Sequence, residues 1–419
     1  MTISRRQALT QLGGLAATVA AGPILSGDSS LGVAPPAAAP ATATDFPRKA
    51  DFAMAEGYTY LNGAYTHPMP KVAAEAMRQW AARRDKVGGP PAPPRSDPRV
   101  AYAALINADP SEIAFIPNTS TGENFVVEAL GIHKFDGNVV TDALHFEGAL
   151  IHLMELRTQG LDLRVVQPRE GRILLEDLAR VIDRKTKLVE VSFVSMYNGF
   201  QHDLKAVCDL AHAHGAYVYA DLIQGVGAVP LDVKATGVDF AATSSYKWLM
   251  GDFGVGFLYM KAELREGVVR RTHWSYESAP DAELHLSPFD PGYPGPVSWT
   301  PGTDTASLVQ LGTYAIGASV GLDASLQYIR EIGVEAIERH RQPMLRRLQE
   351  EMPPLGFRAQ TPVDSRSPIV TFAHADTSGI AERLKKARVD VRVARNWVRV
   401  APSVYNDMED VERLLAASE

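Results

Sequence analysis

An apolar segment followed at once by an acid stands near the middle of this sequence. Residues 214–227 read HGAYVYADLIQGVG, and Ala216–Ala220 has the length and the β-branched and aromatic content of a buried strand. The preceding residues Leu204–His214 follow a helical pattern, which Gly215 ends just after the helix. Asp221 is therefore expected at the carboxyl end of a strand that follows a helix.

The same alternation of strand and helix extends to both sides. Further strands are predicted at Ile113–Ile116, Asn138–Val140, Leu161–Val166, Leu188–Val194 and Phe240–Thr243, and further helices at Asp97–Asn107, from Thr121, and at Gly148–Thr158. Such alternation predicts an α/β fold with a mainly parallel sheet and helices on both of its faces.

The pattern changes towards the C-terminus. Six prolines crowd residues 276–301, helices are predicted from Ser307 to about Glu350, and short strands at Ile369–Phe372 and Trp397–Val400. Long loops of this kind are usually functional. We expect a large domain over residues 86–305, a small C-terminal α+β domain over 306–419, and an N-terminal segment, 46–85, that joins the small domain.

Composition excludes several classes of protein. The 419 residues are 46% hydrophobic and 22% charged, as in ordinary globular proteins. The net charge of −7 argues against a nucleic-acid partner. The single cysteine excludes an intrachain disulfide and a multi-cysteine zinc site.

The first 45 residues are expected to be a targeting signal and linker that are not part of the folded domains. Arg5 and Arg6 precede the apolar, small-residue stretch Leu12–Leu25, and an Ala/Pro/Ser-rich segment follows to about Thr44. This pattern resembles a twin-arginine signal peptide and predicts a periplasmic or otherwise exported protein handled by the twin-arginine export machinery. The alternative is a charged N-terminus before a disordered leader.

Three polar positions follow predicted strands, where open α/β sheets bind their ligands. Asp221 follows one strand, with Gln224 one turn later, and Lys247 follows Phe240–Thr243. The segment Asn118–Asn124, which reads NTSTGEN, joins a strand to a helix whose N-terminus would attract an anion.

Each position also has a purely structural explanation. Asp221 could cap a following helix, Lys247 could be a solvated surface lysine, and Ser120 with Glu123 fits a capping box.

Their order along the chain is the stronger signal. Lys247 comes 26 residues after Asp221, and both follow the anion-binding turn. A pyridoxal phosphate enzyme needs these parts: a helix N-terminus for the phosphate, a carboxylate that keeps the pyridine nitrogen protonated, and a lysine that forms an imine with the aldehyde. Burial beside aromatic residues would lower the pKa of such a lysine. The sequence therefore predicts pyridoxal 5′-phosphate as the cofactor and no metal site.

Tyr217–Gly227 and Asp239–Gly256 together resemble the corresponding segments of the class V aminotransferase family, which includes cysteine desulfurases and isopenicillin N epimerase-like proteins. The resemblance runs from about Tyr58 to the C-terminus. It implies the fold-type I architecture of pyridoxal phosphate-dependent transferases. Trp299–Thr303 resembles a segment that reaches the phosphate of the neighbouring subunit, which implies a homodimer with shared active sites.

The resemblance also implies roles for individual residues. Lys247 is implied as the catalytic residue that holds the cofactor as an internal aldimine and moves the proton. Cofactor-binding roles are implied for Ser120, Thr121, His145, Asp221, Gln224, Ser244, Tyr246 and Thr303. Substrate-binding roles are implied for Arg399, Asn62 and Ala64.

Two of these assignments have competitors. Phe146 stands beside His145 and could be the residue that stacks on the cofactor ring, and Arg392 and Arg395 compete with Arg399 for the substrate carboxylate. Arginine suits that task because its planar guanidinium pairs bidentately with carboxylates.

The chain departs from the desulfurase pattern. Those enzymes use a catalytic cysteine on a loop of the C-terminal domain, whereas the single cysteine here, Cys208, falls on a predicted helix among apolar neighbours. This argues against desulfuration through a persulfide. His212 and His214 are two residues apart on the same predicted helix and point in different directions, which argues against a metal site.

We therefore expect a pyridoxal phosphate-dependent, aminotransferase-like enzyme that acts on an amino acid or amino group, and the Pro-rich loop leaves room for a peptide-borne substrate, as in siderophore tailoring. The expected reaction is transamination through a quinonoid. The alternatives are an epimerase or β-lyase of the same family, and a non-catalytic binding protein that retains the fold.

Overall fold

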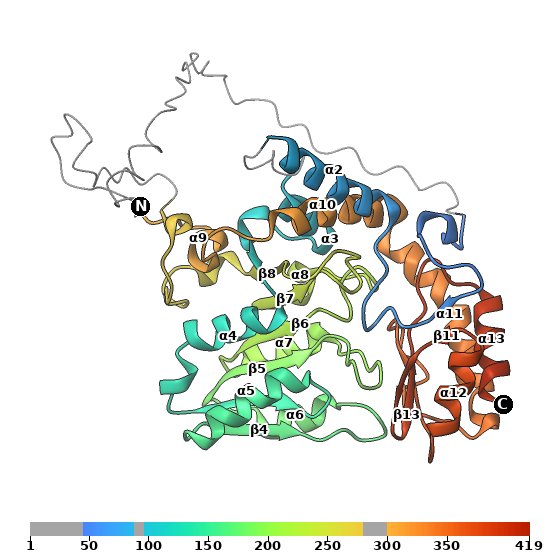
Figure 1. Ribbon diagram of the computed structural model, residues 1–419. Helices are drawn as coiled ribbons and strands as arrows, with labels where there is room; N and C mark the ends of the chain where they lie inside the picture. Colours follow the sequence, from blue (N-terminus) through green and yellow to red (C-terminus); the bar gives the residue numbers. More distant parts are fainter. Residues whose placement is uncertain (1–44, 88–95, 280–299) are drawn as a thin grey trace, which may run out of the picture. The chain divides into compact units, whose positions relative to one another are not determined.

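The computed structural model describes residues 45–87, 96–279 and 300–419 (Figure 1). The expected signal peptide, the Gly/Pro loop after Val87 and most of the segment Tyr276–Trp299 lie outside the described residues. In the part of the chain that is described, no helix is long and apolar enough to cross a membrane.

The helices are α2 (Lys71–Val87), α3 (Pro98–Ile106), α4 (Thr119–Ala129), α5 (Glu147–Thr158), α6 (Leu175–Val181), α7 (Leu204–Ala213), α8 (Val233–Thr236), α9 (Thr305–Val309), α10 (Ile316–Ile332), α11 (Val334–Glu351), α12 (Ser378–Lys386) and α13 (Met408–Ser418). The strands are β1 (Thr59–Tyr60), β2 (Ile113–Ile116), β3 (Asn138–Asp142), β4 (Asp162–Val166), β5 (Thr186–Ser192), β6 (Tyr217–Asp221), β7 (Phe240–Ser244), β8 (Gly256–Met260), β9 (Arg358–Ala359), β10 (Val370–Ala373), β11 (Val389–Asp390), β12 (Arg392–Ala394) and β13 (Trp397–Val400).

A seven-stranded sheet forms the centre of the large domain. Its strand order is β2-β8-β7-β6-β5-β3-β4, and β8 runs antiparallel to the other six strands. The mainly parallel α/β sheet expected from the sequence is therefore confirmed. The adjacent strands β7 and β8 run in opposite directions, and the loop that joins them carries Lys247.

Residues of the central strands alternate between two apolar cores. Val218 and Ala220 of β6 pack on one face with residues of α7, whereas Tyr219 packs on the other face with residues of α4. This alternation follows from the two-residue period of a strand, and it explains why the strands carry apolar side chains on both faces.

The small domain is built on a four-stranded antiparallel sheet in the order β12-β13-β10-β9, with α11, α12 and α13 packed on its core (Figure 1). Strand β1 from the N-terminal segment pairs in parallel with β11. In addition, α2 and α3 pack against α10. The N-terminal segment thus contacts elements far along the chain, although the domain boundaries given above stay a prediction.

Candidate active site

Helix α4 begins differently from the capping box considered above. Its N-cap is Asn118, whose side-chain oxygen accepts from the Thr121 amide at 2.9 Å, while Glu123 pairs with His152 Nδ1 at 2.8 Å. A Cβ on Gly122 would lie 2.7 Å from the Ala242 side chain. Glycine here lets the first turn of α4 approach β7 closely. As a result, Thr119 N donates to Ser244 Oγ at 3.0 Å.

A cavity of about 410 Å³ opens at this point, at the carboxyl ends of β5, β6 and β7. Six of the predicted site residues line it: Ser120, Asp221, Gln224, Ser244, Tyr246 and Lys247. It is also lined by Asn118, Thr119, Phe146, Ser192, Val194, Met196 and Ile223. Polar groups that are distant in sequence therefore share one cavity.

Asp221 and Lys247 both line this cavity, and the charge of each affects the pKa of the other. Burial raises the pKa of Asp221 to about 6, against the opposing effects of a hydrogen bond from the Ile223 amide and the nearby Lys247. Burial lowers the pKa of Lys247 to about 8, which the attraction of Asp221 partly opposes. About one tenth of the amine is then neutral at pH 7, far more than for an ordinary lysine, and a nucleophile or base must be neutral.

Gln224 is held by hydrogen bonds on both sides. Its Nε2 donates to the Ala64 carbonyl at 3.0 Å, and its Oε1 accepts from Trp248 Nε1 at 3.0 Å. Behind it, Arg341 is fully buried, with its guanidinium carbon 5.5 Å from the Trp248 ring centroid. Ala64 therefore contributes a backbone oxygen that orients Gln224, and it does not itself line the cavity.

Phe146, rather than His145, reaches the cavity. His145 is fully buried behind the wall, where its Nδ1 lies 2.9 Å from Ser192 Oγ. Of these two residues, therefore, only Phe146 lines the cavity, and His145 contacts Ser192 instead.

The remaining predicted residues do not line the cavity. Arg399 on β13 is buried and donates to the carbonyl of Met196, a cavity residue, at 2.9 Å. Thr121 lines a neighbouring cavity and bonds to Asn118. Asn62 donates to Asp390 at 3.1 Å, outside the cavity. Thr303 is exposed before α9 and does not line the cavity.

Sequence reasoning missed several lining residues. Thr119 lies inside the quoted NTSTGEN segment, and its position one residue after the cap was the available signal. Met196 and Val194 reach the cavity only because the loop after β5 folds back, with Ser195 N donating to the Phe200 carbonyl at 2.8 Å. No local pattern marks these residues.

Cys208 does not line the Lys247 cavity. It is a free, fully buried thiol on α7 and packs in the apolar core on one face of the large sheet. Burial raises its pKa to about 12. Among the described residues, no group of three or more His, Cys, Asp or Glu side chains could hold a metal ion.

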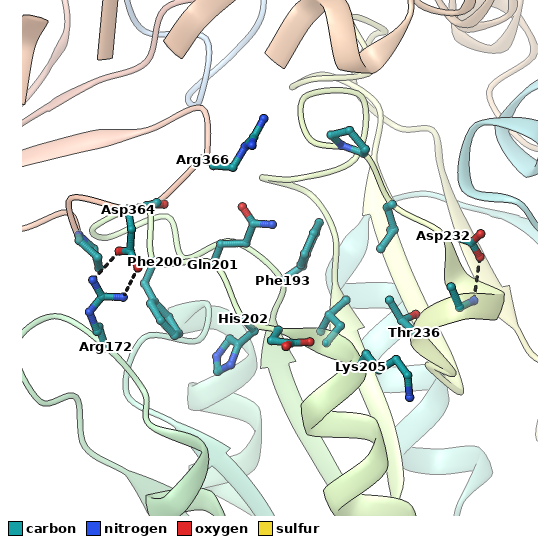
Figure 2. Close-up of a pocket in the computed structure, with 17 residues that line it drawn as sticks. Arg172, Phe193, Phe200, Gln201, His202, Lys205, Asp232, Thr236, Asp364 and Arg366 are labelled. Atoms are coloured by element: carbon teal, nitrogen blue, oxygen red, sulfur yellow. Dashed lines mark hydrogen bonds and ion pairs between the residues drawn. The ribbon is translucent and has the colours of Figure 1, made fainter. Parts of the chain in front are cut away.

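A second cavity, of about 490 Å³, lies where the loop Pro362–Arg366 approaches the large domain (Figure 2). It shares no lining residue with the Lys247 cavity. Its charged side chains already have partners within the described chain, including Arg172 with Asp364, and Arg366 with Glu338 at 2.8 Å. No unpaired charge there points to a ligand.

Glu190 is fully buried on the central strand β5, two residues before Ser192, which lines the Lys247 cavity. Neither of its carboxylate oxygens has a hydrogen-bond partner in the described structure, and the nearest His145 nitrogen is 3.9 Å away. Burial and the charge of Glu123 raise the pKa of Glu190 well above its usual value. Glu190 is therefore protonated over a pH range in which an unfolded-chain glutamate is ionised.

This arrangement predicts a pH-dependent stability. Because the folded chain binds the extra proton, its stability falls as the pH rises above the ordinary glutamate pKa and towards the raised one. Glu190→Gln removes this loss and should stabilise the fold at pH 8. The gain should shrink towards pH 4 in denaturant melts. The exposed control Glu350→Gln should show no such trend, and an equal gain at both pH values would contradict the assignment.

Comparison with known proteins identifies the family. The family model for class V aminotransferases matches residues 95–414. A probable cysteine desulfurase of Methanothermobacter thermautotrophicus is 30% identical over 309 residues, covering 71% of this chain and 73% of the relative.

Two solved structures share the fold. The apo cysteine desulfurase of Thermococcus onnurineus NA1 has a TM-score of 0.77 at 24% identity, covering 89% of this chain and 97% of that one. The C-DES K-to-A mutant with glycine covalently linked to its PLP cofactor has a TM-score of 0.75 at 21% identity, covering 89% and 99%. With its central lysine, acid and helix N-terminus in one cavity, the chain belongs to the class V aminotransferase family.

Proposed function

We propose that this protein is an exported pyridoxal phosphate-dependent enzyme that transfers the α-amino group of an amino acid, either free or borne by a peptide as in siderophore tailoring. The main support for this proposal is that Lys247 and Asp221 share one buried cavity with the hydroxyls at the start of α4. Membership of the class V family and the PLP-linked structure of C-DES support the same cofactor.

The residues present fit this cofactor. Thr119, Ser120 and Ser244 would hold the phosphate, since hydroxyls and free amides at a helix N-terminus favour an anion. Asp221 would hold the proton of the pyridine nitrogen. Gln224 lines the cavity with an amide already oriented by Trp248.

Pyridoxal phosphate, when bound, supplies an aldehyde for imine formation and a ring that stabilises negative charge at the substrate α-carbon. The chain's own groups do the rest. Arg399 would bind the α-carboxylate and orient the α-hydrogen towards Lys247. The Lys247 amine would take that proton on Nζ and deliver it to a different, nearby carbon. Phe146 would cover the reacting carbon and exclude water.

A single amine in the cavity suits transamination, because one base can remove the proton and deliver it to a nearby carbon. Persulfide transfer is disfavoured, since Cys208 is buried on α7 away from the cavity. β-Elimination is the second candidate, because the structural neighbour C-DES is named a cystine C-S lyase and such elimination needs no cysteine of the enzyme. Epimerisation by the same lysine is the third.

The proposed function is tested by reductive trapping. Borohydride treatment of the purified protein, followed by peptide mapping, should place a pyridoxyl group on Lys247. Candidate amino acids should then convert the bound cofactor to pyridoxamine phosphate. A protein that carries no trapped group after incubation with the cofactor would instead be a binding protein that has kept the fold. Release of a β-substituent without pyridoxamine phosphate would identify a lyase.

Export is proposed from Arg5 and Arg6 ahead of the apolar stretch Leu12–Leu25. Replacing both arginines with lysine keeps the charge but removes the arginine pair that the pathway reads. We expect the double variant to stay in the cytoplasm, while the parent protein is found in the periplasmic fraction by immunoblot. Equal periplasmic amounts of the two would contradict the proposal.

A homodimer with shared sites is proposed from the Trp299–Thr303 resemblance, and the exposure of Thr303 agrees with a contact to another chain. Lys247→Ala and Thr303→Val should each be inactive alone. A mixture refolded together should recover activity, since mixed dimers hold one intact site.

A further inference from the structure

Two arginines stand opposite each other on one face of the small-domain sheet. The register of β12 and β13 pairs Arg392 directly with Arg399. Directly paired residues of antiparallel strands point to the same face, with Cβ atoms about 4.5–5.5 Å apart. In the described residues, no carboxylate forms an ion pair with either guanidinium, although carboxylate pairs are frequent elsewhere on this chain.

The two side chains diverge from this shared position. Arg399 is buried and extends to the Met196 carbonyl at the cavity wall, and its Nε has no hydrogen-bond partner in the described structure. Arg392 is exposed and lies over Tyr65, with its guanidinium carbon 5.6 Å from the ring centroid. The two guanidiniums therefore have different surroundings, one buried at the cavity wall and one exposed over Tyr65.

The surroundings connect both arginines to the Lys247 cavity. The charge of Arg399 acts on Lys247, and that of Arg392 acts on Arg399. Tyr65 belongs to the segment 62–67, which continues to a backbone bond from His67 N to the Tyr246 carbonyl at 3.0 Å. Tyr246 lines the cavity. Arg392 and Tyr65 line a further cavity of about 450 Å³, which the segment 62–67 connects to Tyr246, and Arg399 lies behind the wall of the Lys247 cavity at Met196.

Two unpaired guanidiniums on one face repel each other, and a buried one is costly unless an anion compensates it. We propose that the substrate is a dicarboxylic amino acid, whose α-carboxylate binds Arg399 and whose second carboxylate binds Arg392. This inference rests on the proposed function, and it names the substrate class of that site. Arg392 is then a specificity-determining residue at a distance from the reacting carbon.

The inference is tested by binding, without turnover. Succinate and glutarate carry two carboxylates and no amino group, so they cannot react, and butyrate and pentanoate are their monocarboxylate counterparts. Calorimetry on the holoenzyme should show the dicarboxylates binding at least about tenfold more tightly than the monocarboxylates. Arg392→Gln should bring the two classes to equal affinity. Arg392→Lys should keep part of the difference, because the charge remains while the planar fork is lost.

Arg395→Gln is the matched control, since Arg395 is an exposed arginine between the same two strands. It should keep the full preference for dicarboxylates. The inference is overturned if the wild type shows no such preference, if Arg392→Gln retains it, or if Arg395→Gln removes it. Failure of the proposed function would look different, because trapping on Lys247 would fail whatever the carboxylate affinities are.

Discussion

Lys247→Ala is expected to lower turnover at least about 10⁴-fold, because the variant loses both the amine that anchors the cofactor and the base that moves the substrate proton. The physical ground is the position of the amine, which is buried in the cavity with a pKa lowered to about 8. Steady-state kinetics with the best substrate found by pyridoxamine phosphate formation would measure the loss.

Two further lysine variants distinguish the effect of the positive charge of Lys247 from that of its proton transfer. Lys247→Arg keeps a positive charge beside Asp221 but cannot lose its proton, so it should be as inactive as the alanine variant. Lys205→Ala, at an exposed lysine that pairs with Asp209, should leave turnover unchanged. Residual activity of Lys247→Ala within about tenfold of the wild type would exclude this lysine as the base.

The same amine predicts a pH dependence of cofactor uptake. Only the neutral amine attacks an aldehyde, and its fraction rises until the pH exceeds the pKa of about 8. The rate at which stripped protein regains its visible absorption should therefore rise with pH and level off above about 8 at fixed cofactor concentration.

Asp221→Asn should lower turnover by about 10²–10³-fold while the cofactor still binds. Asparagine is nearly isosteric, but it is neutral and cannot hold a proton on the pyridine nitrogen. The hydroxyls of Thr119, Ser120 and Ser244 and the amine of Lys247 remain to bind the cofactor. Turnover and the visible spectrum of the bound cofactor, measured on the same samples, would separate the two effects.

Asp221→Glu is the control for this prediction. It keeps the carboxylate at a slightly altered position and should retain more activity than the asparagine variant. In the protein without cofactor, the pKa of Asp221 is about 6, so cofactor affinity should also weaken as the pH falls below about 6. Full activity of Asp221→Asn would show that the carboxylate does not act on the ring.

Much of the fold was accessible from local patterns. Each of the predicted strands of the large sheet appears within a few residues of its expected bounds, because a buried parallel strand is a short, nearly continuous apolar run. The antiparallel β8 and the short helix α6 were not predicted. The strand Gly256–Met260 has the same apolar character as its neighbours, and nothing in such a run records the direction in which it pairs.

Some features of the candidate site were likewise predictable from the sequence, and others were not. The sequence by itself determined that an acid, a lysine and the turn Asn118–Asn124 would stand at strand ends, since these positions follow from local periodicity and from the parallel sheet. Only the tertiary structure decided that Phe146 and not His145 faces the cavity, that Ala64 and Trp248 orient Gln224, and that Arg392 stands beside Arg399. These relations join residues up to 160 positions apart, and they depend on strand register and on how whole elements pack, which no local pattern encodes.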